Sequence, residues 1–187
     1  MFARRPPDND YLRSQATTAI ALAADTAARD LAARIVEASD DHRERRTLAQ
    51  RLVDQLNAEF GLPPCGVVVA DRAQVHEHDG RRLQSKTYGY YRCSLRGGAV
   101  NGARIRIYHR TAVRQQVISS KVFLNTVLHE WTHHYDFAAL GLGRSPHTAG
   151  FYARLRSLAE ALRVAFVLPP EPEPASTGPS VADIFRR

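Results

Sequence analysis

Residues Val127–Asp136, which read VLHEWTHHYD, determine how the rest of the chain is interpreted. His129 and His133 stand four positions apart, so on an α-helix they project from one face, one turn apart. Two imidazoles placed in this way can share one Zn²⁺. Glu130 then lies beside the metal, where a general base takes a proton from water. A packed or solvated helix face is the alternative for such a pair, so the motif needs further support.

A third histidine lies where a third ligand is needed, because a catalytic zinc site has three protein ligands and one open position. His147 follows His133 after a break that contains three residues typical of helix ends and turns: Gly141, Gly143 and Pro146. Thr148 can then cap a second helix, whose apolar residues recur at helical spacing. Glu160 on that helix is the alternative third ligand. The sequence favours His147, at a helix N-terminal junction.

The order of these residues resembles a known family. In chain order they are His129, Glu130, His133, Tyr135, His147 and Phe151. An HExxH motif followed by a third histidine in an H-x-x-x-F start to the next helix resembles the SprT-like zinc metallopeptidases, the family that includes the DNA–protein crosslink protease Spartan. The resemblance covers roughly residues 60–166. The zinc ribbon that many bacterial members carry after the protease core is not in the sequence.

The resemblance implies a fold and a set of roles. The implied fold is zincin-like, and the implied zinc ligands are His129, His133 and His147. Glu130 is implied as the catalytic base of a zinc metalloendopeptidase that cleaves proteins or peptides. Tyr135 matches a tyrosine of Spartan-like members and is a candidate to stabilise the oxyanion, with a packing role as its alternative.

Length and periodicity predict three segments in the 187 residues. Residues 1–60 read as helices packed on the core, with an Ala-rich helix over 9–38 and a second helix from the Ser39–Asp41 cap to about Phe60. Residues 61–168 form the protease core, and the Pro-rich residues 169–187 form a disordered tail. The predicted class is α+β, with a small, mostly antiparallel sheet followed by the HExxH helix and one further helix.

Three strands are expected before the motif, at residues 66–70, 83–93 and 103–109. In the third, alternation places Ile105 and Ile107 on the core, and it places Arg104, Arg106 and Tyr108 on the open face. By resemblance only, this third strand is assigned the rim of the substrate cleft, where it would hold a peptide by strand addition.

Charge is concentrated in the same region. The chain carries a net charge of +7, and residues 81–121 hold ten basic residues and no acidic one. Tyrosines are interleaved with these arginines, so DNA is a candidate partner of this face. An Arg-rich but otherwise ordinary surface is the alternative.

Two further expectations concern the compartment and the function. The chain has only two cysteines, Cys65 and Cys93, which favours a reducing cytoplasm and leaves one disulfide open. No apolar run approaches a membrane span. A zinc metallopeptidase is the favoured function. The alternatives are a nucleic-acid-binding module with a structural zinc and a zinc hydrolase of a non-peptide amide.

Overall fold

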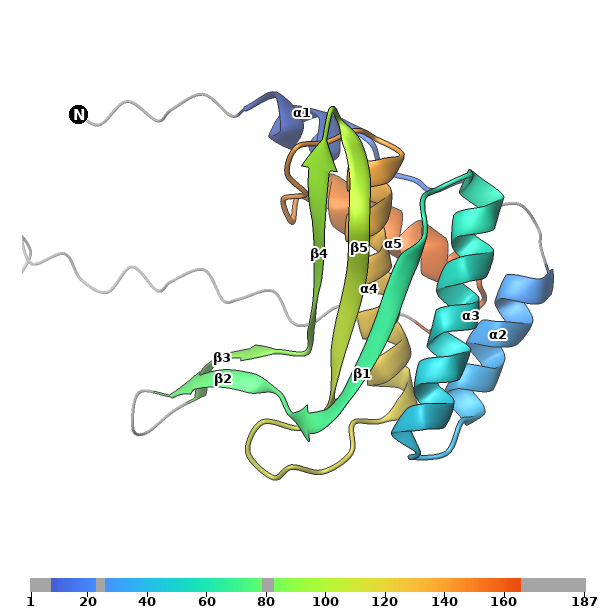
Figure 1. Cartoon of the computed structure of the whole chain (residues 1–187), viewed down its shortest axis with the longest axis vertical. Helices are drawn as coiled ribbons and strands as arrows, with labels where there is room; N and C mark the ends of the chain where they lie inside the picture. Colours follow the sequence, from blue (N-terminus) through green and yellow to red (C-terminus); the bar gives the residue numbers. More distant parts are fainter. Residues whose placement is uncertain (1–7, 23–25, 79–82, 166–187) are drawn as a thin grey trace, which may run out of the picture.

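The computed structural model describes residues 8–22, 26–78 and 83–165, and these residues form an α+β fold (Figure 1). The helices are α1 (Asn9–Ala16), α2 (Thr26–Glu37), α3 (His42–Phe60), α4 (Ser120–Ala138) and α5 (Ala149–Ala161). The strands are β1 (Cys65–Ala73), β2 (Val75–His78), β3 (Leu83–Thr87), β4 (Gly89–Arg96) and β5 (Ala99–Arg110). The predicted tail at 169–187 lies outside the described residues.

The single helix predicted over residues 9–38 is wrong, because α1 ends at Ala16 and α2 begins at Thr26. The Thr17 backbone is extended after α1. Ile20 in the link is buried, and its backbone amide donates to Ser157 Oγ of α5 at 2.9 Å. Contacts with α5 therefore hold the backbone around Ile20 outside a helix, although propensity alone favours one.

Helix α3 begins and ends where its sequence predicts. The Asp41 carboxylate accepts hydrogen bonds from the amides of Arg43 and Glu44, both at 2.8 Å. At the other end Gly61 has φ of 61°, a left-handed conformation that glycine adopts without a steric penalty.

The main sheet is small, as expected, but it is mixed, since one of its two strand pairings is parallel. Its strand order is β1-β5-β4, with β1 parallel and β4 antiparallel to the central strand β5. The strand predicted over 83–93 is divided at Tyr88, which separates β3 from β4. Strands β2 and β3 pair with each other as a second, two-stranded sheet.

The two edges of the main sheet differ. The Gln50 side chain of α3 covers the outer edge of β1, since it donates to the Cys65 carbonyl at 3.0 Å and accepts from the Val67 amide at 2.7 Å. Strand β4 is the other edge, and α4 packs against both β4 and β5. The open strand edge therefore lies beside the helix that carries the HExxH motif.

The core lies between the sheet and helices α2 to α5. Side chains that it buries completely include Ile105, Ile107, Phe123, Val127, Leu128, Trp131, Phe151 and Leu158. Full burial of one such side chain stabilises the fold by about 1.5–3 kcal/mol. The buried Trp131 indole also donates to Asn57 Oδ1 at 2.8 Å, which joins α4 to α3. Helix α4, which carries the motif, is thus held by the sheet and by α3.

Two further features concern the cysteines and the lengths of the helices. Cys65 and Cys93 are both free thiols. In the part of the chain that the structure describes, every helix is too short or too polar to cross a membrane.

Candidate metal centre

Three histidines converge at the junction of α4 and α5. His129 and His133 come from α4, and His147 comes from the loop before α5, whose first turn is capped by the Thr148 hydroxyl. The Nε2 atom of His147 lies 3.1 Å from that of His129 and 3.0 Å from that of His133. The fold thus brings together the three histidines that the sequence analysis selected, and together they could hold a metal ion. Glu160, the alternative, is not in this cluster.

The donor set fits a tetrahedral metal ion. Ligand atoms about 2.0–2.1 Å from one tetrahedral zinc lie about 3.3–3.4 Å from each other, close to the Nε2 separations in the cluster. Burial, followed by the other imidazoles, lowers the pKa of His129 to about 4 and that of His133 to about 2. The His147 side chain is exposed on one side, and the partial loss of solvent around its ring also lowers its pKa. At neutral pH the rings are uncharged, which is the form that binds metals.

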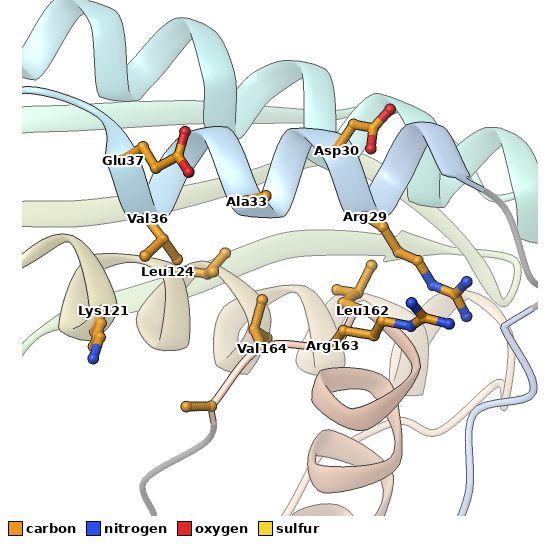
Figure 2. A pocket seen from close by; sticks show the side chains of 11 residues that line it. Arg29, Asp30, Ala33, Val36, Glu37, Lys121, Leu124, Leu162, Arg163 and Val164 are labelled. Carbon is orange, nitrogen blue, oxygen red and sulfur yellow. The ribbon is translucent and has the colours of Figure 1, made fainter.

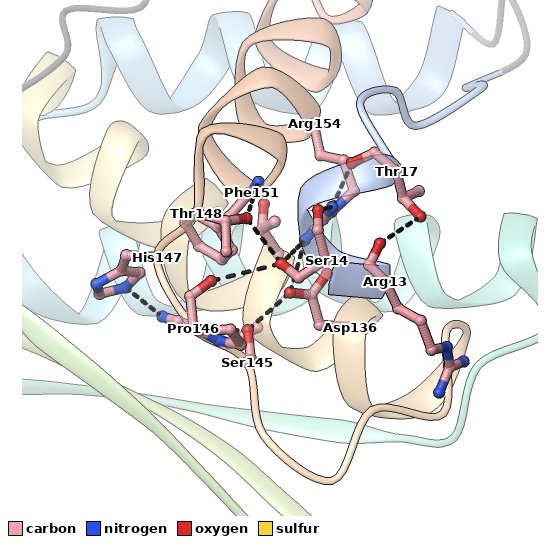
Figure 3. Close-up of polar contacts among 12 residues, drawn as sticks. Arg13, Ser14, Thr17, Asp136, Ser145, Pro146, His147, Thr148, Phe151 and Arg154 are labelled. Atoms are coloured by element: carbon pink, nitrogen blue, oxygen red, sulfur yellow. Dashed lines mark hydrogen bonds and ion pairs between the residues drawn. The ribbon is translucent and has the colours of Figure 1, made fainter. Parts of the chain in front are cut away.

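A hydrogen-bonded relay fixes the tautomer of His133. Its members Ser145 and Asp136 are drawn in Figure 3. Ser145 Oγ donates to Asp136 Oδ2 at 2.7 Å and lies 2.7 Å from His133 Nδ1. Because the Ser145 proton is directed to the carboxylate, its oxygen accepts the proton of His133 Nδ1. The Nε2 lone pair of His133 is therefore free for a metal. The structure thus places Ser145 between His133 and Asp136.

The ring of Phe151 forms the floor of the cluster. It is fully buried, and its centroid lies 5.1, 4.7 and 5.0 Å from the imidazole centroids of His129, His133 and His147. This apolar floor excludes water from one side of the cluster, which strengthens the electrostatic interactions there.

Glu130 lies under the edge of β4. Its carboxyl group is buried and accepts a hydrogen bond from the Tyr91 amide. Burial raises the pKa of Glu130 to about 8, and the Tyr91 amide opposes this rise. A β-carbon at Gly89 would lie 3.4 Å from Glu130 Oε1, so glycine allows the strand to approach the carboxylate closely. A carboxyl group with a pKa near neutrality can both take up and release a proton, which general acid–base chemistry requires.

Tyr135 lies on the opposite side of α4 from the histidines. Its ring centroid is 5.3 Å from that of Phe60 and 5.7 Å from that of Trp131. At about 100° per residue, Tyr135 is turned by roughly 160° from His133. This placement matches the packing alternative.

The rim assigned to residues 103–109 is corrected by the strand order. β5 is the central strand, and its backbone groups already pair with β1 and β4, so it cannot add a peptide strand. Arg104 is exposed and Arg106 half-buried, as expected of the open face, with the Arg106 guanidinium 6.0 Å from the Tyr90 ring centroid. Tyr108 is buried instead, with its ring 6.4 Å from that of Tyr90.

A separate groove of about 560 Å³ lies between α2, the start of α4 and the end of α5 (Figure 2). Val36, Leu124 and Val164 line it, together with charged side chains such as Arg29 and Glu37. None of the three histidines contributes to this groove, so the metal centre is a different place on the molecule.

Comparisons with protein-family models, with curated proteins and with solved structures found no match for this chain. The chemistry of the site is therefore argued from its own residues.

Proposed function

We propose that the chain is a zinc-dependent metallopeptidase with a zincin-like, SprT-like core. The observation that carries the proposal is the convergence of three neutral imidazoles beside a buried carboxylate, Glu130. A zinc ion held by His129, His133 and His147 supplies, when bound, a Lewis acid that polarises a carbonyl and lowers the pKa of water. Structural zinc sites instead use a fourth protein ligand. Among the described residues the cluster contains three, which favours a catalytic site.

Glu130 is the proton carrier in this proposal. Its buried carboxylate takes a proton from the attacking water and passes it to the leaving amine when the peptide bond breaks. The Tyr91 amide holds the carboxylate in place. Because both transfers are made by one group, replacement of Glu130 by glutamine abolishes hydrolysis while it leaves the imidazoles intact.

Strand β4 is the proposed peptide-binding edge. Gly89 approaches Thr126 and Glu130, and Tyr91 packs against Phe137, so β4 runs along α4 past the site. An extended peptide can add to such an edge through main-chain hydrogen bonds. A groove of about 340 Å³ lies next to Tyr88, the residue before β4, and is lined mostly by residues 111–119. An open edge favours a peptide substrate over a small amide.

The experiment compares wild type with Glu130→Gln, and the matched control is Glu160→Gln on the exposed surface of α5. We expect all three proteins to hold one zinc per chain by metal analysis. Wild type and the control cleave a denatured, fluorescently labelled protein, and Glu130→Gln does not. Hydrolysis by Glu130→Gln at the wild-type rate rejects the mechanism, and a chain without zinc rejects the metal centre.

A second candidate function is DNA binding on the open face of the sheet. The guanidinium carbon of Arg92 lies 5.0 Å from the ring centroid of Tyr90, and that of Arg106 lies 6.0 Å from the same centroid. Within the described residues, the ion pairs include neither of these arginines nor Arg104. Such a surface attracts phosphates and offers a ring for base stacking. The proteolysis experiment, repeated with single-stranded DNA and a basic DNA-binding substrate, separates a DNA-stimulated peptidase from one indifferent to DNA.

A further inference from the structure

The loop that supplies His147 is held by the N-terminal segment of the chain. Asp10 Oδ2 accepts hydrogen bonds from the amides of Gly143 and Arg144, both at 3.0 Å. Two further contacts join the same segments: the ion pair of Asp8 with Arg144 and the hydrogen bond from Arg13 to the Leu140 carbonyl. The loop between α4 and α5 is therefore fixed from outside by residues more than 120 positions away in the sequence.

A buried arginine connects the same segment to the relay behind His133 (Figure 3). Arg154 of α5 is completely buried, and it donates to the Ser14 carbonyl at 2.7 Å and to the Thr17 carbonyl. Its other terminal nitrogen donates to Asp136 Oδ2 at 2.9 Å, the oxygen that also accepts from Ser145. Burial raises the pKa of Asp136, and the Arg154 charge together with the hydrogen bonds from Ser145 and Arg154 opposes the rise.

The contact between α1 and α5 is too close for any residue but glycine at position 150. A β-carbon there would lie 2.1 Å from the Ser14 carbonyl oxygen and 2.6 Å from that of Gln15. The Ser14 hydroxyl lies 2.9 Å from that of Thr148, the residue after His147. The end of α1 is thus seated on the first turn of α5, directly behind the ligand loop.

We propose that the segment Asp8–Thr17 is a positioning element of the metal centre. It holds His147 through the loop, and it holds His133 through Arg154, Asp136 and Ser145. The inference rests on the metal centre of the proposed function and adds to it a part of the chain outside the motif. Partners behind a ligand typically change metal affinity by about 10- to 100-fold, although they do not touch the metal.

The experiment measures the zinc affinity of the full-length chain by competition with a chromogenic chelator, and it measures the thermal unfolding of the metal-free chain in parallel. Asp10→Ala removes the acceptor of two loop amides. Its matched control is Asp41→Ala, which removes the same arrangement, one carboxylate oxygen that accepts two consecutive amides, from the start of α3. We expect Asp10→Ala to weaken zinc binding by about 10-fold or more and Asp41→Ala to leave it unchanged.

A second pair addresses the relay. Ser145→Ala removes the acceptor of His133 Nδ1, and its control is Ser94→Ala, where an exposed hydroxyl donates to the Asn101 carbonyl. We expect weaker zinc binding in the first variant only. Equal zinc affinity in Asp10→Ala, Ser145→Ala and wild type overturns the inference and leaves the peptidase proposal standing. A wild-type chain that binds no zinc overturns both. A wild type that binds zinc but cleaves nothing overturns the peptidase alone.

Discussion

At Gly89, strand β4 approaches both β5 and the motif helix closely. A β-carbon there would lie 2.7 Å from the Arg106 carbonyl oxygen and 2.9 Å from the Thr126 methyl group. The carbonyl belongs to the central strand, which is held on both sides, so it cannot move away independently. Restoring an ordinary contact of 3.4 Å moves β4 by about 0.7 Å, and this shift also displaces the Tyr91 amide from Glu130.

We therefore expect Gly89→Ala to lower the free energy of unfolding by about 1–3 kcal/mol, the usual effect of overpacking. Peptide hydrolysis is expected to fall on the order of 10-fold, because a displacement below 1 Å at a catalytic group is costly. The control is Gly66→Ala on β1, where the added carbon meets nothing nearer than 4.0 Å. Urea unfolding of the metal-free proteins measures the free energy of unfolding of each variant. Cleavage of the labelled protein by the zinc-loaded variants measures hydrolysis. If Gly89→Ala unfolds at the same urea concentration as wild type, the close packing of β4 against α4 is refuted.

Two other predictions concern single side chains. His109 is buried and donates from Nε2 to the Asp40 carbonyl at 2.8 Å, while its Nδ1 has no hydrogen-bond partner among the described residues. Burial lowers the pKa of His109 below its ordinary value of 6.5. Below pH 6.5 the unfolded chain therefore binds a proton that the folded chain does not. The free energy of unfolding consequently falls as the pH falls. His109→Gln should flatten this decline in urea unfolding between pH 7 and pH 5, and an unchanged slope would contradict the assignment. Tyr135→Phe should retain wild-type hydrolysis, because the Tyr135 ring packs on Phe60 and Trp131; a loss of 10-fold or more would restore the oxyanion role that the resemblance implies.

The sequence predicted those parts of the fold that local signals determine. Asp41 and Gly61 mark the ends of α3, and Thr148 marks the start of α5, because each satisfies backbone groups next to it in the chain. The parallel pairing of β1 with β5 has no local signal. Along the chain, β1 is followed by β2, β3 and β4. Strand β5 comes last, although it lies between β1 and β4 in the sheet. Strands that follow one another in the chain are usually neighbours in a sheet, and local sequence does not determine which strand becomes central.

The residues of the candidate site also divide into those that local sequence reveals and those that it does not. The spacing of His129 and His133 is a property of one helix, and His147 follows from a short loop, so all three were found in the sequence. Arg154 was missed because an arginine on a helix is ordinarily solvated. Its position three residues after Phe151 and one before Leu155 places it on the buried stripe of α5, and this was the available signal. Ser14 carries no such signal, since its contact with Arg154 spans 140 positions.

The N-terminal contacts bear on how an exposed loop can supply a ligand. His147 is exposed, and ordering each loop residue costs about 1–2 kcal/mol of backbone entropy. If the metal alone ordered the loop, this cost would be subtracted from its binding free energy. Asp10 and Arg154 form their contacts when the chain folds. The loop therefore loses its backbone entropy during folding and not on metal binding, and the imidazoles are preorganised. Coupling of this kind is reciprocal. If the cluster binds a metal as proposed, a metal that binds more tightly when α1 is seated on α5 must also hold α1 there, and the first helix and the HExxH motif would stabilise each other.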